Sequence, residues 1–325
     1  MKIYAILSLI VFLSLALFPM ACFIDKDTAT TKQESTSLHT GEVQTEDKEE
    51  KEETITVLRA SSGKTEQVDM TEYLIGAVAN EMPASFHIEA LKAQAVACHT
   101  YALWILKNAD NPNNDLGDIS DNSGKHQGYL NKNEMKKKWG DSYEKYYNRI
   151  SDAVNDVKDL YLDYDGEPIL AVFHALSSGT TSNCKDVWGD DIPYLKSVPA
   201  PGDKLSAQLD SEEAFTKEEL EEKLGLKEEK EELISDLNTA DSGYVTKIII
   251  GEKSFTGRQL RRLLGLKSPN FTYKQEKDNY TFAVKGKGHG VGMSQYSADF
   301  MARQGSSYKE ILTHFYSGAE IKKVS

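Results

Sequence analysis

The chain has 325 residues, of which 39% are hydrophobic and 27% are charged, and its formal net charge is −13 at pH 7. This excess of acidic residues argues against nucleic acid as a partner, because phosphate backbones are bound by basic surfaces. The sequence contains no Gly-x-Gly-x-x-Gly run and no Walker pattern, so a nucleotide-binding function has little support either.

The first residues have the composition of a membrane segment. Lys2 precedes an apolar run, residues 3–24, whose main polar interruptions are Ser8 and Ser14. About 20 apolar residues can cross a bilayer as a helix, and Lys2 on the short side predicts that the rest of the chain lies outside the cytoplasm. A cleaved signal peptide or a poor lipoprotein site at Cys22 are the alternatives. Because the run is long for a signal peptide, we favour a retained transmembrane anchor at residues 1–24.

Residues 25–53 are rich in Thr, Ser, Glu and Lys and nearly free of large apolar side chains, and residues 46–53 are all charged. Such a segment cannot bury a hydrophobic core. We therefore expect a disordered acidic and polar linker that separates the membrane segment from a globular domain at residues 54–325.

The globular part begins with a predicted hairpin and an amphipathic helix that ends near Glu81. Asp69 is a candidate helix cap, and Glu72 is placed to close a capping box three residues later. Glu81 follows Leu74 and Val78 on the same apolar face, and Pro83 stops the helix. A carboxylate held against apolar surface should have a raised pKa, as a general acid working near neutral pH requires. The alternative is a helix-end Glu turned towards solvent.

A second helix is predicted directly after Pro83, over residues 84–103. Apolar residues at helical spacing form one stripe, and the many alanines favour helix and allow close packing. The chain is therefore expected to run from helix through a tight turn to helix, with Glu81 at the corner.

The remaining elements do not alternate regularly. The predicted strands and helices are a hairpin at 54–58 and 65–68, a hairpin at 161–164 and 169–173, strands at 245–250 and 281–284, and helices at 217–224 and 257–264. This order favours an α+β fold of mixed helices and antiparallel strands. Residues 210–237 are charged with few leucine anchors, and we predict a helical surface insertion there.

The last conspicuous pattern is a run of glycines at positions 286, 288, 290 and 292. Their period of two suggests an extended segment whose backbone passes close to other backbone or to a ligand. His289, Ser294, Gln295 and Tyr296 follow with polar groups and an aromatic face, a mixture that suits sugar strands. A packed strand–helix junction stabilised by the glycines explains the same residues equally well.

Four motifs then occur in order between residues 54 and 321: Glu81-Met82-Pro83 with the run 89–97, His174 to Gly179 before Trp188-Gly189, the segment 257–268 in looser form, and the run from Gly288 to Tyr296. Each motif alone is weak, but together they make the chain resemble the SpoIID/LytB family. The resemblance implies an extracytoplasmic lytic transglycosylase with a catalytic cleft, acting on peptidoglycan glycan strands with Glu81 as its single acid/base. It also implies substrate-binding positions at Gln94, His99, Tyr101, His174, Ser178, His289, Ser294, Gln295 and Tyr296.

By the same resemblance, the protein would work beside a cell-wall amidase on strands stripped of stem peptides, in the intermembrane space during spore engulfment. A non-catalytic wall-binding protein that enhances an amidase is the alternative within the family. Ordinary glycosidases need two carboxylates, one of which activates water or attacks the sugar. When the nucleophile is a hydroxyl group of the substrate itself, its proximity replaces that second carboxylate.

The chain departs from the family pattern at several positions. His99 stands where the family usually has Arg, which removes a permanent cation. Zinc-binding members use Cys and His around a Cys-Gln-x-Tyr segment, whereas residues 125–129 contain no Cys. We therefore expect neither a metal nor another cofactor. If a metal were bound, His174 and Cys184 would be the rival pair of ligands. A disulfide between Cys98 and Cys184 is possible outside the cytoplasm.

Overall fold

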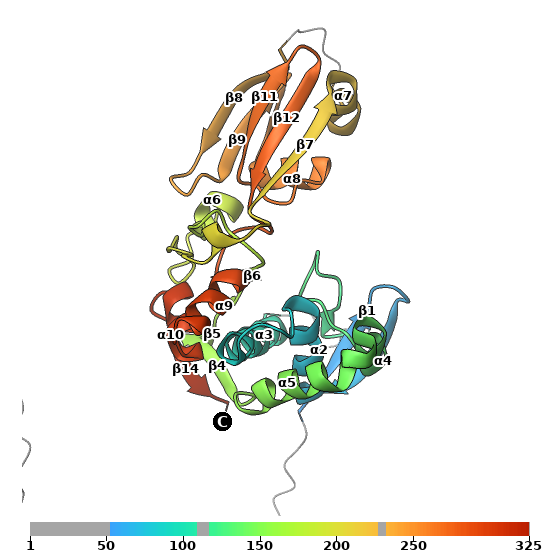
Figure 1. Ribbon diagram of the computed structural model, residues 1–325, viewed down its shortest axis with the longest axis vertical. Coiled ribbons are helices and arrows are strands. Elements are labelled where there is room, and N and C mark those ends of the chain that lie inside the picture. The colour runs from blue at the N-terminus through green and yellow to red at the C-terminus, as the bar shows by residue number, and fades with distance from the viewer. Residues whose placement is uncertain (1–52, 109–116, 227–231, 325) are drawn as a thin grey trace, which may run out of the picture. The chain divides into compact units, whose positions relative to one another are not determined.

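A computed structural model describes residues 53–108, 117–226 and 232–324 (Figure 1). The predicted anchor at 1–24 and nearly all of the predicted linker at 25–53 lie outside the described residues. Within the described ranges, no helix is both long enough and apolar enough to span a membrane.

The first half of the described chain is dominated by helices. Its elements are β1 (Thr54–Arg59), β2 (Lys64–Asp69), α2 (Met70–Glu81), α3 (Ile88–Lys107), β3 (Ile119–Ser120), α4 (Lys132–Trp139), α5 (Tyr143–Asn155), β4 (Leu160–Tyr164), β5 (Glu167–Pro168) and β6 (Phe173–His174). The β1–β2 hairpin is confirmed, with Thr54 opposite Asp69. The second hairpin is confirmed at its turn, but the returning strand predicted at 169–173 is not found there: the strand that pairs with β4 is β5, and residues 169–172 are irregular.

The second half contains more strands. Its elements are α6 (Cys184–Trp188), β7 (Asp210–Thr216), α7 (Lys217–Leu224), β8 (Ile234–Thr239), β9 (Val245–Ile250), β10 (Lys253–Phe255), α8 (Gly257–Leu264), β11 (Phe271–Glu276), β12 (Asn279–Lys285), β13 (Met293–Ser294), α9 (Gln295–Arg303), α10 (Tyr308–Phe315) and β14 (Glu320–Lys323). The predicted α+β class is confirmed. Most strand pairs are antiparallel, while β1–β3 and β6–β13 are parallel.

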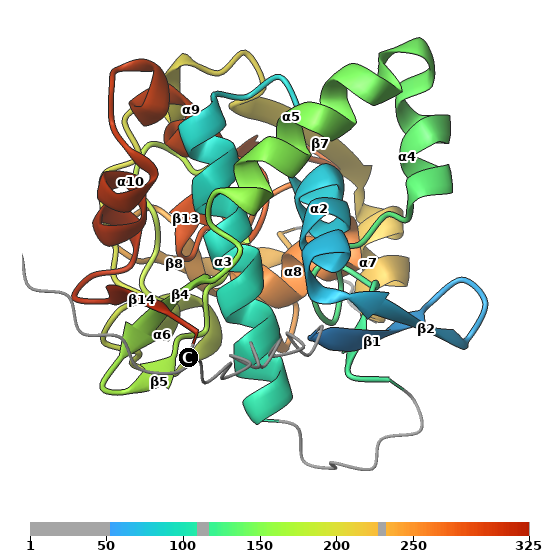
Figure 2. The ribbon, with the colours of Figure 1, turned by 90° about the horizontal axis from the view of Figure 1, so that it is seen from below.

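The larger hydrophobic core surrounds α3. This helix packs against α2 and α5 on one side and against α9, α10 and β4 on the other, as Figure 2 shows from below. Eleven of its residues are buried, among them the alanines that allow close packing. The predicted start at residue 84 was too early, because residues 83–87 form a turn and His87 caps the helix by accepting a hydrogen bond from the Glu89 N–H.

A second hydrophobic core lies between two three-stranded sheets and two helices. The sheets have the strand orders β11-β12-β7 and β10-β9-β8, and α7 and α8 supply Leu220, Leu224, Leu260 and Leu264. The predicted helical insertion at 210–237 is found only in part, because Lys217–Leu224 is helix α7 but the segments on either side are strands β7 and β8 of the sheets around this core. Asp210–Thr216 is strand β7, and its side chains alternate between exposed and half-buried. Asp210 and Glu212 lie on its exposed face, while Glu213 shares the half-buried face with Phe215.

Candidate functional site

Glu81 is the last residue of α2 and is partly exposed. Its Oε1 atom accepts two hydrogen bonds, from the Gly128 N–H at 2.8 Å and from the Asn80 side-chain amide at 3.1 Å. Among the described residues nothing donates to the second oxygen, Oε2. One carboxylate oxygen is thus fixed in place, and the other is free to carry a proton or meet a substrate.

The surroundings of Glu81 raise its pKa. Burial is the largest cause, because it penalises the charged carboxylate, and the Gly128 N–H, the Asn80 amide and the charge of Lys138 act in the opposite direction. The prediction of a carboxylic acid with a raised pKa at this corner agrees with the surroundings found here. A group of this kind can remain protonated at higher pH than an ordinary Glu.

The segment that fixes Glu81 could not be found from local sequence pattern. Residues 126–130 run beside α2, and Leu130 donates to the Gly76 carbonyl at 3.2 Å. A Cβ atom on Gly128 would lie 1.8 Å from the Asn80 Nδ2 and 3.0 Å from the Glu81 Oε1. A side chain at this position would displace the Asn80 amide and crowd the Glu81 carboxylate, so glycine allows the backbone to approach both.

One face of α3 carries Gln94, Cys98 and Tyr101 at helical spacing of four and three residues. The charge of Glu81 contributes to raising the pKa of the Cys98 thiol, although burial is the main cause. Gln94 donates to the Cys98 sulfur at 3.3 Å and accepts from the Gln295 amide at 3.1 Å. Gln94 and Gln295 are both buried, so they join α3 to α9 and do not offer free groups to a ligand.

Tyr101 and His99 have different surroundings, although only one residue separates them. Tyr101 is partly exposed and stacks on Trp104, with ring centroids 6.5 Å apart. His99 is only 2% exposed, and its Nδ1 lies 3.0 Å from the Leu160 carbonyl of β4. Burial lowers the pKa of His99. The buried imidazole of His99 is therefore suited to its neutral form, and its contact with the Leu160 carbonyl joins α3 to β4.

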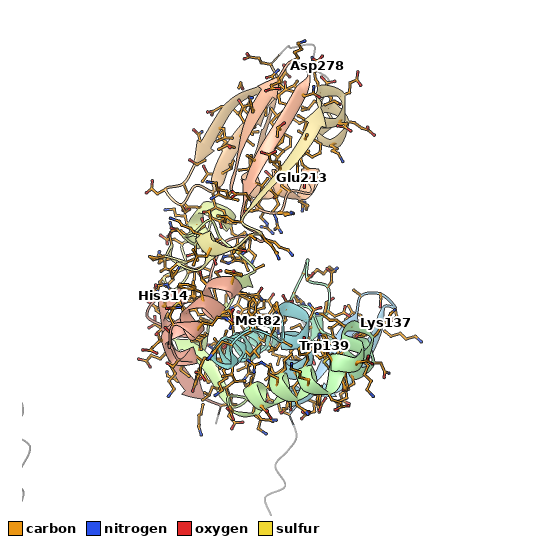
Figure 3. The ribbon with its side chains drawn as sticks, viewed as in Figure 1. Met82, Lys137, Trp139, Glu213, Asp278 and His314 are labelled. Atoms are coloured by element: carbon orange, nitrogen blue, oxygen red, sulfur yellow. The ribbon has the colours of Figure 1, made fainter. Side chains whose placement is uncertain are left out.

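The turn that follows Glu81, residues 82–87, is held from two helices. Met82, labelled in Figure 3, is buried directly after Glu81. Arg149 of α5 donates to the carbonyls of Ala84 and Phe86 at 3.0 and 2.7 Å. Asp299 of α9 accepts from the His87 N–H at 2.6 Å. We call Glu81 together with residues 82–87 the corner; its position is fixed by long-range contacts that the sequence did not reveal.

Tyr296 of α9 is the predicted aromatic residue that reaches the corner. Its ring lies edge-on to Phe86 with centroids 6.4 Å apart, and it is partly exposed. The same helix thus supplies both a structural anchor, Asp299, and a half-exposed aromatic surface beside the corner.

The glycine-rich segment, residues 286–296, is not extended at its glycines as expected, and it leads through β13 into α9, as the alternative of a strand–helix junction describes. Its four glycines have φ angles between 71° and 112°, a region that favours glycine. The expected close approach to other backbone is found, since a Cβ on Gly292 would lie 2.0 Å from the Val172 carbonyl oxygen.

Two predicted site histidines meet at this segment. The rings of His174 and His289 have centroids 5.7 Å apart, and His289 also lies 5.0 Å from Trp188. Burial lowers the pKa of His174 to about 4 and that of His289 to about 3, where the neighbouring His174 adds to the effect. Both imidazoles are thus neutral near pH 7.

The predicted serines are joined to structural partners. Ser294 caps α9 and donates to the buried Asp203 at 2.8 Å. Ser178 accepts from the Asn270 amide at 3.0 Å. Ser294 is buried and Ser178 is partly exposed.

Cys98 and Cys184 are both free and buried, so the possible disulfide between them is not formed. In the described part of the chain, no group of three or more His, Cys, Asp and Glu side chains is arranged to hold a metal ion.

Comparison with known proteins places these features in a family. The family model described as "Stage II sporulation protein" matches residues 59–164. The chain is 38% identical to "Stage II sporulation protein D" of Bacillus subtilis (strain 168) over 270 residues, which cover 83% of this chain and 79% of that protein. It is also 38% identical to the protein of that name from Bacillus amyloliquefaciens over 272 residues, covering 83% and 78% of the two chains. The chain belongs to the SpoIID family.

A more distant relative has a different name. The "Amidase enhancer" of Bacillus subtilis (strain 168) is 28% identical over 306 residues, which cover 76% of this chain and 40% of that protein. The SpoIID match over residues 59–164 includes both Glu81 and Gly128, the two residues that form the 2.8 Å hydrogen bond.

Proposed function

We propose that this SpoIID-family protein is a lytic transglycosylase that cleaves the bond between N-acetylmuramic acid and N-acetylglucosamine in peptidoglycan. The observation that carries the proposal is the isolation of Glu81. Among the described residues, the one charged group that acts on its pKa is Lys138, and no second carboxylate does so. Glycosidases that use water or a protein nucleophile need a second carboxyl group about 5–9.5 Å away.

A single acid/base suffices when the nucleophile belongs to the substrate. Protonated Glu81 donates its proton to the glycosidic oxygen as the bond to the anomeric carbon breaks. The 6-hydroxyl of the same muramic acid ring then attacks that carbon, and its proton returns to Glu81. The products are a 1,6-anhydro end and a free 4-hydroxyl on N-acetylglucosamine, with no water consumed. Holding the two groups of one ring in place supplies the effective concentration that an external nucleophile lacks.

The proposed setting is outside the cytoplasm. The apolar residues 1–24 would anchor the chain, and the domain would act on peptide-free strands between the two membranes of engulfment, beside an amidase. The similarity to a sporulation protein of B. subtilis supports this setting.

Mass spectrometry of peptidoglycan digests tests the proposal. The domain from Thr54 onward is incubated with intact and with amidase-treated peptidoglycan. We expect anhydro-muramic ends from the parent protein and a loss of at least about a thousandfold in Glu81→Gln, since the proton donor is gone. Glu72→Gln is the matched control, because Glu72 lies on the same helix and pairs with Lys132 at 3.0 Å. Reducing ends in place of anhydro ends, or an undiminished rate in Glu81→Gln, would contradict the mechanism.

The second candidate function is enhancement of an amidase without cleavage. It is favoured by the similarity to the amidase enhancer and by His99 in place of the family's usual Arg. It predicts no new glycan ends from the parent protein, and faster release of stem peptides when the protein is added to an amidase.

A further inference from the structure

Lys138 is a cation beside Glu81 that the proposed mechanism does not use. It lies on α4, and its ammonium donates to the carbonyl of Ala79 at 2.8 Å. That carbonyl belongs to the last turn of α2, where backbone oxygens lack helical partners and a positive charge is favourable. The hydrogen bond therefore holds the Lys138 ammonium at the carbonyl of Ala79, two residues before Glu81 in the sequence.

The ammonium is near Glu81 but is not paired with it. Its charge opposes the rise in the Glu81 pKa, yet these two described residues form no ion pair. Such a pair would hold the carboxylate in its charged form and prevent it from acting as an acid. Glu81 therefore keeps an Oε2 atom, and Lys138 an ammonium, that are not bonded to each other.

Lys138 is also available to a ligand. Its side chain is exposed, and its single hydrogen bond among the described residues leaves two of its three N–H groups for other acceptors. The other lysines of α4 are occupied or remote. Lys132 pairs with Glu72, Lys136 lies over the Tyr143 ring, and the exposed Lys137 has no effect on Glu81. Figure 3 labels Lys137 and Trp139, which flank Lys138 on this helix.

We propose that Lys138 binds a carboxylate of the sugar whose bond Glu81 cleaves, and so selects strands that lack stem peptides. The inference rests on the proposed function and names the residue that would read this feature of the substrate. Muramic acid bears a lactyl group that is an amide where a stem peptide is attached and a free carboxylate where the peptide has been removed. Only the carboxylate offers a full negative charge to the ammonium, and a charge-assisted hydrogen bond is about twice as strong as a neutral one.

Two strand preparations of equal length, with and without stem peptides, test the proposal. We expect Lys138→Gln to lower kcat/KM on peptide-free strands by about 10- to 100-fold, the usual range for losing a hydrogen bond to a charged group. On peptide-bearing strands the same variant should change little. Lys138→Arg should keep most of the preference because it keeps the charge, and Lys137→Gln should behave like the parent protein. An equal loss on both strands, or a shift of the pH profile without a change in preference, would overturn the proposal.

Binding without cleavage separates this proposal from the proposed function. Strand affinity is measured in Glu81→Gln, and in the same variant with Lys138→Gln added. If Lys138 reads the carboxylate, the added substitution weakens binding of peptide-free strands alone, whether or not the parent protein cleaves them. Equal affinity of both variants for peptide-free strands would refute the role of Lys138 and leave the transglycosylase proposal standing.

Discussion

The corner and the glycine-rich segment carry the two most specific motifs of the sequence, but their polar groups are used differently. In the corner, Glu81 is partly exposed and keeps one carboxylate oxygen without a donor among the described residues. In the glycine-rich segment, Ser294 and Gln295 are buried and bonded to Asp203 and Gln94. Tyr296 is the residue of this segment that reaches the corner with a partly exposed ring.

The comparison teaches how to separate chemistry from architecture within a family motif. A polar group that is half-buried and has an unpaired donor or acceptor can still bond to a substrate or exchange a proton with it. A polar group that is buried and fully bonded stabilises the fold, and its removal costs stability before it costs activity. Substitutions at the two regions should therefore fail in different assays.

After Glu81→Gln itself, the largest effect on activity is expected from Gly128→Ala. The added methyl group would overlap the Asn80 side chain and crowd the Glu81 carboxylate. A misplacement of about 1 Å in a catalytic group can cost about a hundredfold in rate, so we expect a loss of that size in kcat/KM for glycan cleavage. The number of anhydro ends formed per minute measures it.

The matched control is Gly124→Ala in the same loop. There the added methyl group meets only the end of the Asn122 side chain, at 3.0 Å. Parent-like activity in the control with a large loss in Gly128→Ala would assign the effect to the Glu81 contact. Equal activity of both variants would show that the contact has no catalytic importance.

A large effect on stability, not activity, is expected at Asp203. This fully buried carboxylate accepts hydrogen bonds from the Ser177 N–H, the Ser177 hydroxyl, Ser294 and Ser297. Asp203→Ala leaves these donors unpaired and should lower the free energy of unfolding by about 3 kcal/mol or more. Urea denaturation of the domain measures this change.

Ser294→Ala makes the comparison sharper, since Ser294 was predicted to bind substrate. Losing one hydrogen bond to a charged partner should cost about 1.5–3 kcal/mol of stability, while kcat/KM per folded molecule stays within about twofold of the parent value. A loss of cleavage with unchanged stability would instead restore the substrate-binding role of Ser294.

The parts of the fold that were predicted from the sequence are those with local causes. Helices 217–224 and 257–264 have the predicted bounds, because Thr216 and Thr256 form capping boxes and Gly225 and Gly265 end the helices in the left-handed region. The capping box predicted at Asp69 is only half formed. Asp69 accepts from the Glu72 N–H, but the Glu72 carboxylate pairs with Lys132.

The missed features have distant causes. Gly128 and Glu81 are separated by 47 positions in the sequence, and no periodic pattern connects them. Strand β7 was read as helix because its charged residues were taken as a solvated helix face, whereas pairing with β12 determines its structure. Long-range pairing thus decided both the arrangement of the site and the strand structure of β7.

The smallest effect is a pH-dependent gain of stability in Glu81→Gln. Because burial raises the Glu81 pKa in the folded protein, its contribution to stability is fully present below the unfolded value, near 4.5, and is lost as the pH rises through the folded pKa. Gln keeps an oxygen for the Gly128 N–H but has no charge to bury. The urea midpoint of Glu81→Gln relative to the parent should therefore increase between pH 4 and neutral pH and then level off. A lower midpoint than the parent at neutral pH would show that the carboxylate stabilises the corner, and that its position there needs no catalytic explanation.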